Sequence, residues 1–176
     1  MNDRSMSGVT YCEQWSRHYK ERHTLLTEQE AQERHREGKL YTAVLGDAQS
    51  PWCFLEFSAF RSVAVEFLDS SLRTYLGYSF QEMAANRFFV SKIRQLKFLN
   101  DADVMDRGNL YLCDMSGRVV IEHYVANSDG VGSRIVDREE RVVDVSGFWE
   151  PFPEFGKYEG LSRIDRGIPI LKEFQP

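Results

Sequence analysis

Two glutamates that interrupt apolar stretches are the clearest candidates for acid–base chemistry. Glu56 and Glu66 each lie among aliphatic and aromatic residues. Paired carboxylates about 5 to 10 Å apart are the catalytic groups of most glycoside hydrolases. The sequence contains nothing else that requires such an enzyme, and a glutamate within a strand commonly faces solvent or an arginine. We therefore assign no catalytic residue and expect a protein that is not an enzyme.

Histidine spacing argues against a zinc site. His18, His23 and His35 lie in a region that we expect to be helical, at separations of five and twelve residues. Two ligands on one helical face lie three or four residues apart. His123 shares the apolar side of an expected strand with Ile121, as a core or rim histidine would. We predict no metal and no cofactor.

The three cysteines, Cys12, Cys53 and Cys113, are odd in number and far apart, which fits neither a disulfide framework nor a zinc motif. None has a histidine or basic cluster beside it in the sequence that would activate its thiol.

No apolar run is long enough for a membrane helix, and the first residues lack the features of a secretory signal. We expect buried free thiols in a cytoplasmic protein with no membrane contact.

An acidic loop before Gly108 partly matches a calcium-binding loop. Its acids are Asp101, Asp103 and Asp106. It lacks the glycine at the sixth position, and Leu112 stands where a bidentate glutamate would be needed. We interpret it as a solvated acidic loop that can contact a partner.

The most distinctive segment spans residues 148–158, with five aromatic residues, two prolines and two glutamates in neither a helical nor a strand period. One interpretation is that the aromatic residues plug the open end of a sheet. The other is that some of them are exposed anchors, because aromatic residues dominate interface hot spots and prolines reduce the ordering cost of binding. The candidate partner-binding residues are Trp149, Glu150, Phe152, Glu154, Phe155 and Tyr158, together with Asp101, Asp103 and Asp106.

Two helices are expected to precede any sheet. Tyr11, Trp15 and Tyr19 lie four residues apart, which predicts an amphipathic helix over residues 10–23. Thr27 followed by Glu30 forms the pattern of a capping box, and Gly38 suits the end of that second helix. Because its interior is almost entirely polar, we expect this helix to be anchored by Leu25, Leu26 and Leu40.

From residue 40 onward, short runs of aromatic and β-branched residues alternate with turn-forming residues, which is typical of an antiparallel meander. We expect strands near 40–45, 52–57, 61–68, 72–80, 87–96, 109–114, 117–125 and 134–145. The predicted fold class is α+β, with an N-terminal helical segment followed by a mainly antiparallel, strongly curved β-sheet. Residues 1–176 are expected to form a single domain, comprising the helical segment 1–39, the meander 40–147 and a loop and tail over 148–176.

The charge distribution favours a basic partner. The formal net charge is −5, and its whole excess of acids follows residue 39. Segment 137–159 holds seven acids against three bases. A protein that binds nucleic acid normally has the opposite charge, so we expect no nucleic-acid partner.

A resemblance rests on Val65-Glu66-Phe67-Leu68-Asp69, on the stretch from Leu72 to Phe80, on Arg87-Phe88-Phe89 and on the stretch from Trp149 to Gly156. With these motifs, the chain resembles bacterial immunity proteins encoded beside polymorphic toxins. The resemblance implies a non-enzymatic antitoxin of bacterial competition, including systems with type VI secretion. Its partner would be a cognate protein toxin, and occlusion of a basic active-site cleft would neutralise it.

Two other functions stay open at this point. One is a small enzyme or ligand-binding barrel whose pocket is lined by Trp52, Phe54, Tyr75 and Tyr111, which requires a cavity with convergent polar groups. The other is a general interaction module, which requires a broad apolar patch.

Overall fold

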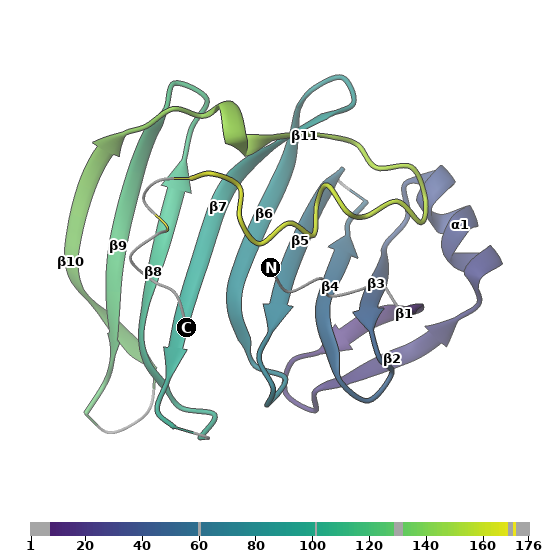
Figure 1. Ribbon diagram of the computed structural model, residues 1–176, viewed down its shortest axis with the longest axis horizontal. Helices are drawn as coiled ribbons and strands as arrows, with labels where there is room; N and C mark the ends of the chain where they lie inside the picture. Colours follow the sequence, from purple (N-terminus) through teal and green to yellow (C-terminus); the bar gives the residue numbers. More distant parts are fainter. Residues whose placement is uncertain (1–7, 60, 101, 129–131, 169–170, 172–176) are drawn as a thin grey trace.

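A computed structural model describes residues 8–59, 61–100, 102–128, 132–168 and 171. In this part of the chain, eleven strands form one open antiparallel sheet, accompanied by a single α-helix, α1 (Glu28–Glu37), and a short 3-10 helix over Ser146–Phe148 (Figure 1). The strands are β1 (Val9–Ser16), β2 (Glu21–Leu26), β3 (Tyr41–Gly46), β4 (Pro51–Phe57), β5 (Ser62–Leu68), β6 (Thr74–Ala84), β7 (Arg87–Phe98), β8 (Met105–Cys113), β9 (Arg118–Ala126), β10 (Ser133–Val142) and β11 (Trp149–Pro151).

The strand order is that of a meander with one rearrangement at its N-terminal end. From one edge to the other it runs β10, β9, β8, β7, β6, β5, β4, β3, β1, β2. The short strand β11 pairs with the first residues of β7. Strands β3 to β10 correspond to the eight strands expected from the sequence, because alternating side chains and turn residues are strong local signals.

The predicted α+β class is wrong, because the described residues are mostly strand and include no N-terminal helical segment; their one α-helix, α1, lies between β2 and β3. The expected helix over residues 10–23 is replaced by the hairpin of β1 and β2. Tyr11 packs in the main core, Trp15 packs in a separate cluster, and Tyr19 is 69% exposed. A spacing of four residues occurs in strands as well as on one face of a helix, so the pattern could not distinguish them, and in β1 it does not mark a single buried face.

Helix α1 forms where its capping signals predicted. The Thr27 hydroxyl accepts a hydrogen bond from the Glu30 amide at 3.2 Å, and the Glu30 carboxylate accepts one from the Thr27 amide at 2.8 Å. Gly38 ends the helix in the left-handed conformation, with φ of 65°. The expected anchors are largely wrong, since Leu25 and Leu40 are exposed; the helix buries Ala31 instead.

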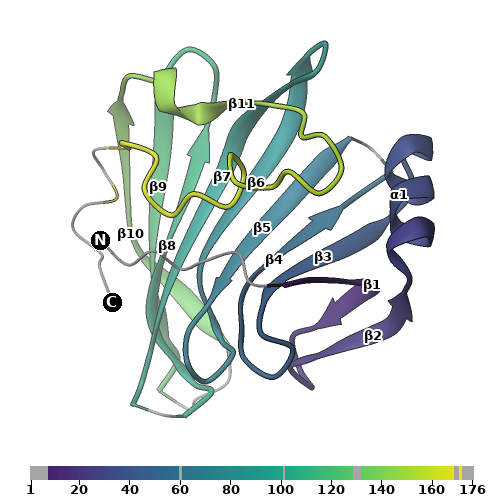
Figure 2. The same cartoon turned by 45° about the vertical axis from the view of Figure 1, so that its right-hand side comes forward.

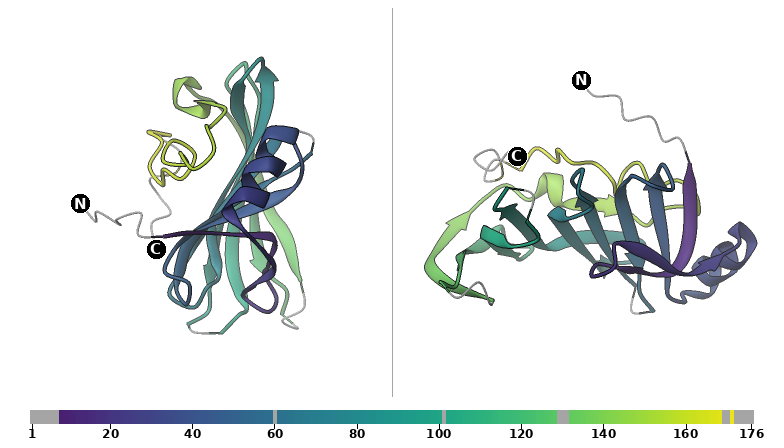
Figure 3. Two further views of the ribbon diagram at one scale, coloured as in Figure 1. Left: turned by 90° about the vertical axis from the view of Figure 1, so that its right-hand side faces the viewer. Right: turned by 90° about the horizontal axis from the view of Figure 1, so that it is seen from below.

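Residues 143–168, which we call the strap, cross one face of the sheet. Figures 1 and 2 show the strap running from the end of β10 towards α1 and then turning back over the middle strands. Seen from the side in Figure 3, the part of the strap after β11 lies on one side of the sheet. Its residues Phe148, Tyr158 and Leu161 are buried in the main core between strap and sheet. The strap is therefore the second layer of the fold, in place of the expected helices.

A smaller cluster lies on the opposite face of the sheet, which we call the back face. Trp15 from the β1–β2 hairpin stacks on Phe54 of β4, with ring centroids 5.5 Å apart. Cys12, Val44 and Leu68 complete this cluster. The hairpin thus closes part of the face that the strap leaves open.

Candidate functional site

A buried ion pair joins the outgoing and returning parts of the strap. Arg166 donates from Nη1 to Glu150 Oε1 at 2.8 Å and from Nη2 to the carbonyls of Gly160 and Leu161. Its guanidinium lies over the rings of Tyr78 and Phe80. Burial lowers the pKa of Arg166, although the Glu150 carboxylate opposes that shift. Glu150, a candidate contact residue, is only 8% exposed and has this structural partner.

The aromatic residues of the strap divide into buried and half-buried groups. Tyr158 is fully buried, with its hydroxyl 3.4 Å from the hydroxyl of Tyr41. Phe155 stacks on Tyr11 with centroids 5.2 Å apart and is partly buried. Trp149 and Phe152 are also partly buried against the core. All four therefore pack on the sheet, as the plug interpretation requires, and a partner could reach only the exposed parts of three of them.

Helix α1 meets the strap through His35. Its ring lies 5.0 Å from the ring of Phe152 and 5.8 Å from that of Phe155, and its Nδ1 is 2.8 Å from the Tyr41 hydroxyl. Burial lowers the pKa of His35, and a hydrogen bond with the backbone of Pro153 opposes this shift. The neutral imidazole is thus a packing element between helix and strap.

Exposed carboxylates gather where α1 meets the strap. We call this surface, made of α1, Leu40 and strap residues 152–159, the acidic end. Glu28 lies close enough to the strap to help raise the pKa of Tyr158, after the larger effect of burial. The exposed acids of this surface are Glu28, Glu30, Glu33, Glu37, Glu154 and Glu159.

The acidic end is hollowed beside the helix. A cavity of about 420 Å³ is lined by Glu30, Glu33, Arg34, Glu37, Lys39 and Leu40. The cations are already paired, since Arg34 binds Glu13 at 2.6 Å and Lys39 binds Glu37 at 2.7 Å. Leu40 is 50% exposed and offers apolar surface. This hollow combines carboxylates with an accessible aliphatic side chain, which suits a basic side chain with an apolar stem.

The second group of predicted contact residues lies elsewhere. Asp103 follows the end of β7, whereas β11 pairs with the beginning of that twelve-residue strand. The Asp103 carboxylate accepts a hydrogen bond from Lys20 Nζ at 2.7 Å, and Asp106 lies 3.9 Å from Arg107 Nε. Asp101 lies outside the described residues. The structure therefore does not bring Asp103 and Asp106 together with the strap residues in one surface.

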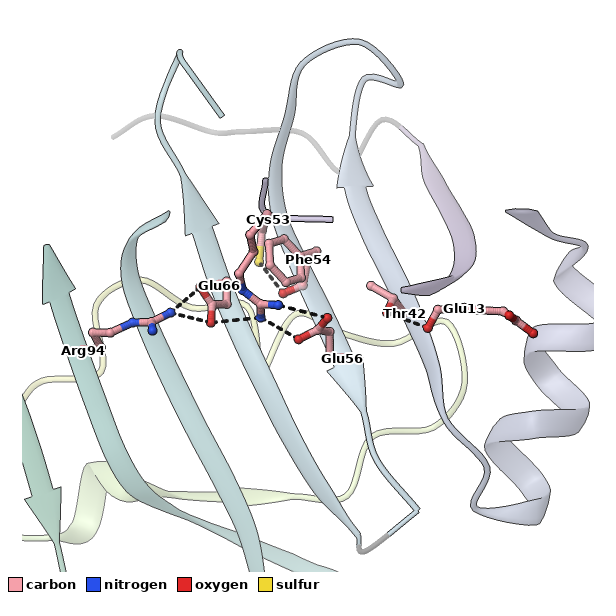
Figure 4. A network of polar contacts seen from close by, with 8 residues as sticks. Glu13, Thr42, Cys53, Phe54, Glu56, Glu66 and Arg94 are labelled. Carbon is pink, nitrogen blue, oxygen red and sulfur yellow. Dashed lines mark hydrogen bonds and ion pairs between the residues drawn. The ribbon is translucent and has the colours of Figure 1, made fainter. Parts of the chain in front are cut away.

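Glu56 and Glu66 share an arginine on the back face. Arg17 Nη2 lies 2.6 Å from Glu56 Oε2 and 3.2 Å from Glu66 Oε1. Arg94 also donates to both oxygens of Glu66, at 2.8 and 2.9 Å. Figure 4 shows Glu56, Glu66 and Arg94 projecting from β4, β5 and β7 on this face. Each carboxylate has a guanidinium partner, so the network accounts for the position of both glutamates in the fold.

A second hollow, of about 270 Å³, lies on the strap face of β8, β9 and β10. The Tyr111 hydroxyl donates to Gln95 at 2.7 Å, and Asn109 donates to the Tyr111 hydroxyl at 3.2 Å. His123 connects Asn109, 2.8 Å from its Nδ1, to Glu139, 3.5 Å from its Nε2. Sequence reasoning assigned His123 to a core or rim position and missed this hydrogen-bonded row, because its members come from four different strands.

The pocket proposed for a ligand-binding barrel is not assembled as expected. Tyr111 lines the second hollow, but Phe54 is buried on the back face beside Trp15. Trp52 and Tyr75 pack against the main core. Phe54 therefore cannot share a pocket with residues of the strap face.

The thiols are poor candidates for nucleophilic chemistry. Cys12 and Cys53 are buried, Cys113 is partly buried, and none of the three is in a disulfide. Burial raises the pKa of Cys12 to about 11 and that of Cys113 to about 12, and it raises the pKa of Cys53 well above its usual value. The described residues include no group of three or more His, Cys, Asp or Glu side chains arranged to hold a metal ion.

Comparison of this chain with protein-family models, curated proteins and solved structures gave no match. Over the described residues, no helix has the length and apolar character needed to cross a lipid bilayer.

Proposed function

We propose that this chain is a non-enzymatic immunity protein that binds a bacterial toxin and blocks its active site. The observation that carries the proposal is the acidic end, which combines a hollow lined by Glu30, Glu33, Glu37 and Leu40 with exposed carboxylates of the strap, the segment that α1 contacts through His35. The resemblance to immunity proteins suggests the type of partner, and the charge of this surface suggests which face meets it.

An acidic surface suits a toxin that acts on nucleic acids or nucleotides, because the active-site clefts of such toxins are commonly basic. Complementary charge accelerates the encounter and selects the partner. Leu40 and the exposed parts of Phe152 and Phe155 supply apolar contacts within the same surface. A partner of ordinary size would cover roughly 1,600 Å² in total, which extends beyond the hollow to the neighbouring strap.

The rigid setting of the acidic end supports slow release of the toxin. Helix α1 is capped at both ends, and His35 packs it against the strap. A surface that is already ordered loses little conformational entropy on binding. In the proposed function, the main role of the aromatic residues of the strap is to hold this surface in a fixed conformation.

The proposal expects a neighbouring gene to encode the toxin, and co-expression with the toxic domain of that protein tests it. We expect wild-type protein to restore growth, and a Glu33→Lys and Glu154→Lys double variant to restore it poorly while accumulating as folded protein. Both side chains are exposed, so their replacement leaves the core intact. Equal protection by the double variant would refute the acidic end as the contact surface, and failure of wild-type protein to protect would refute neutralisation of that toxin.

The second hollow favours one other function, the binding of a small polar ligand. His123, Asn109 and Glu139 present hydrogen-bonding groups there, with Arg107 and Arg141 on the wall. Binding would appear as thermal stabilisation by a ligand that is lost in a His123→Phe variant. If the same ligand stabilises that variant equally, it does not bind at His123.

A further inference from the structure

Strand β10 is a sheet edge with unusual exposure. Every one of its residues is exposed except Glu139, which is partly exposed. β9 pairs with it along one side. Its apolar residues Ile135, Val136 and Val142 are 51%, 51% and 80% exposed. A long strand with an open edge and exposed apolar side chains is a template for pairing with another strand.

The backbone groups that face the open edge can be assigned. Val143 donates its amide to the carbonyl of Gly117 at 2.9 Å, on the β9 side. Backbone groups alternate between the two sides of a strand, so those of Arg138, Glu140 and Val142 point to the open side. The Arg138 amide is accordingly bonded to the side chain of Asp137, at 2.8 Å, rather than to β9. Over the described residues only β9 pairs with β10, so the other edge of β10 offers donors and acceptors at every second residue.

We infer that two copies of this chain associate through β10, which pairs with β10 of the second copy in antiparallel fashion about a two-fold axis. A strand that pairs with itself about an axis perpendicular to the sheet keeps each face continuous, so only residues of the same face lie opposite each other. Residues 138, 140 and 142 share the back face, and residues 137, 139 and 141 share the strap face, as their pairing with β9 indicates.

One register satisfies both the hydrogen bonds and the charges. With Glu139 at the axis, Arg138 of each copy lies opposite Glu140 of the other, and their outward backbone groups bond directly. The same register places Asp137 opposite Arg141, and it brings the exposed Val142 to the level of Val136 at the bulge of β10. Opposite charges across antiparallel strands stabilise the pair, and apolar contacts add to this.

The neighbouring registers are disfavoured by the same charges. If Arg138 lies at the axis instead, it is opposite its own copy, and Asp137 is opposite Glu139. If Glu140 lies at the axis, it is opposite its own copy. Charged residues on an edge strand usually prevent association. Here their alternating signs oppose these shifted pairings and favour a single one.

The favoured register has two costs that nearby groups offset. The two copies of Glu139 meet at the axis, but each is bound by Arg141 at 3.1 Å and lies 3.5 Å from His123. Asp137 must leave the Arg138 amide, which then bonds to a carbonyl of the second copy instead.

The dimer would join two sheets at their β10 edges and leave the acidic ends at the far margins, beyond β3 and β1. Each copy could then bind a toxin molecule, although the association itself does not depend on that function.

Sedimentation equilibrium of the full chain tests this inference. We expect wild-type protein to dimerise reversibly with concentration. Arg138→Glu places like charges opposite each other twice in the dimer and should raise the dimer dissociation constant about tenfold or more. Adding Glu140→Arg to that variant recreates opposite charges across the axis and should restore dimerisation. Glu140→Pro removes an outward amide that makes no bond to β9, and it should abolish the dimer.

Far-UV circular dichroism checks that each variant is folded, and the proline and charge variants test the edge independently. A wild-type protein that stays monomeric at its highest soluble concentration overturns the inference. Dimers that persist in both Arg138→Glu and Glu140→Pro, or a charge swap that fails to restore association, overturn it as well. None of these measurements involves a toxin, so they are independent of the proposed function.

Discussion

Glu150 on β11 and Arg166 near the end of the strap form an ion pair that is almost completely removed from solvent. The Arg166 side chain is 0% exposed and that of Glu150 is 9% exposed. The two residues come from the outgoing and returning parts of the strap, so the pair closes the strap into a loop. Arg163, which is half exposed, binds the same carboxylate from the solvent side. This arrangement makes the strap a structural layer of the molecule.

Removing Arg166 should destabilise the fold strongly. Arg166→Met leaves the Glu150 carboxylate buried without its principal partner, and loss of one member of such a pair costs about 3 to 5 kcal/mol. Arg163→Met is the matched control, and we expect it to cost about 1 kcal/mol or less because its pair is open to solvent. Urea denaturation measures both values. Equal losses in the two variants would show that burial of the Arg166 pair has no special role.

Stability should fall when the solution becomes mildly acidic. His35 has a lowered pKa in the folded protein, relative to an ordinary value of 6.5. Below pH 6.5, His35 therefore binds a proton more readily in the unfolded chain than in the folded chain. As the pH falls, the free energy of unfolding decreases until the pH reaches the pKa of His35 in the folded protein. Carboxylates with lowered pKa values, such as Asp69, contribute at more acidic pH.

Denaturation curves across pH 7 to 5 measure this dependence, and His35→Gln is the informative variant because glutamine can hydrogen-bond to Tyr41 without titrating. We expect its unfolding free energy to vary less with pH in this range. A variant with the wild-type slope would assign the proton uptake to another group.

The two back-face glutamates should differ in their contribution to stability. Glu66 is 7% exposed and bound by Arg94 and Arg17, and Arg94 Nε is itself buried with no hydrogen-bond partner. Glu66→Ala removes the counter-charge of partly buried guanidinium groups and should cost about 2 to 4 kcal/mol. Glu56→Ala should cost about 1 kcal/mol or less, because the Glu56 side chain is 22% exposed, against 9% for Glu66. Thermal unfolding compares the two, and an equal effect would contradict this ranking.

The strands from β3 to β10 could be predicted because each carries its own alternation and turn residues. The hairpin of β1 and β2 could not. Its turn has no glycine, asparagine or proline; Lys20 adopts φ of 55°, and Ser16 accepts a hydrogen bond from the Tyr19 amide. Helix α1 has local capping signals and was predicted, but its contact with the strap depends on His35 meeting residues more than a hundred positions away.

The candidate site was predictable only in part. The aromatic composition of residues 148–158 identified a segment that packs on the sheet, and the charge distribution identified acids in the strap. The carboxylates of α1 were not among the predicted contact residues, since no local pattern indicates that α1 lies beside the strap. Likewise, nothing in the sequence around Glu150 indicates Arg166 as its partner, because the pair forms only when the strap turns back.

The central claim is that the acidic end captures a toxin. Isothermal titration of the purified chain with the toxic domain that the proposal expects a neighbouring gene to encode tests this most directly. We predict tight binding by wild-type protein. Glu33→Lys with Glu154→Lys should weaken it about tenfold or more, with the largest difference at low salt. Glu140→Lys, at the opposite edge of the sheet, should leave the affinity per chain unchanged even if it prevents dimerisation. Unchanged affinity in the acidic-end variant, or an equal loss in Glu140→Lys, would contradict the account.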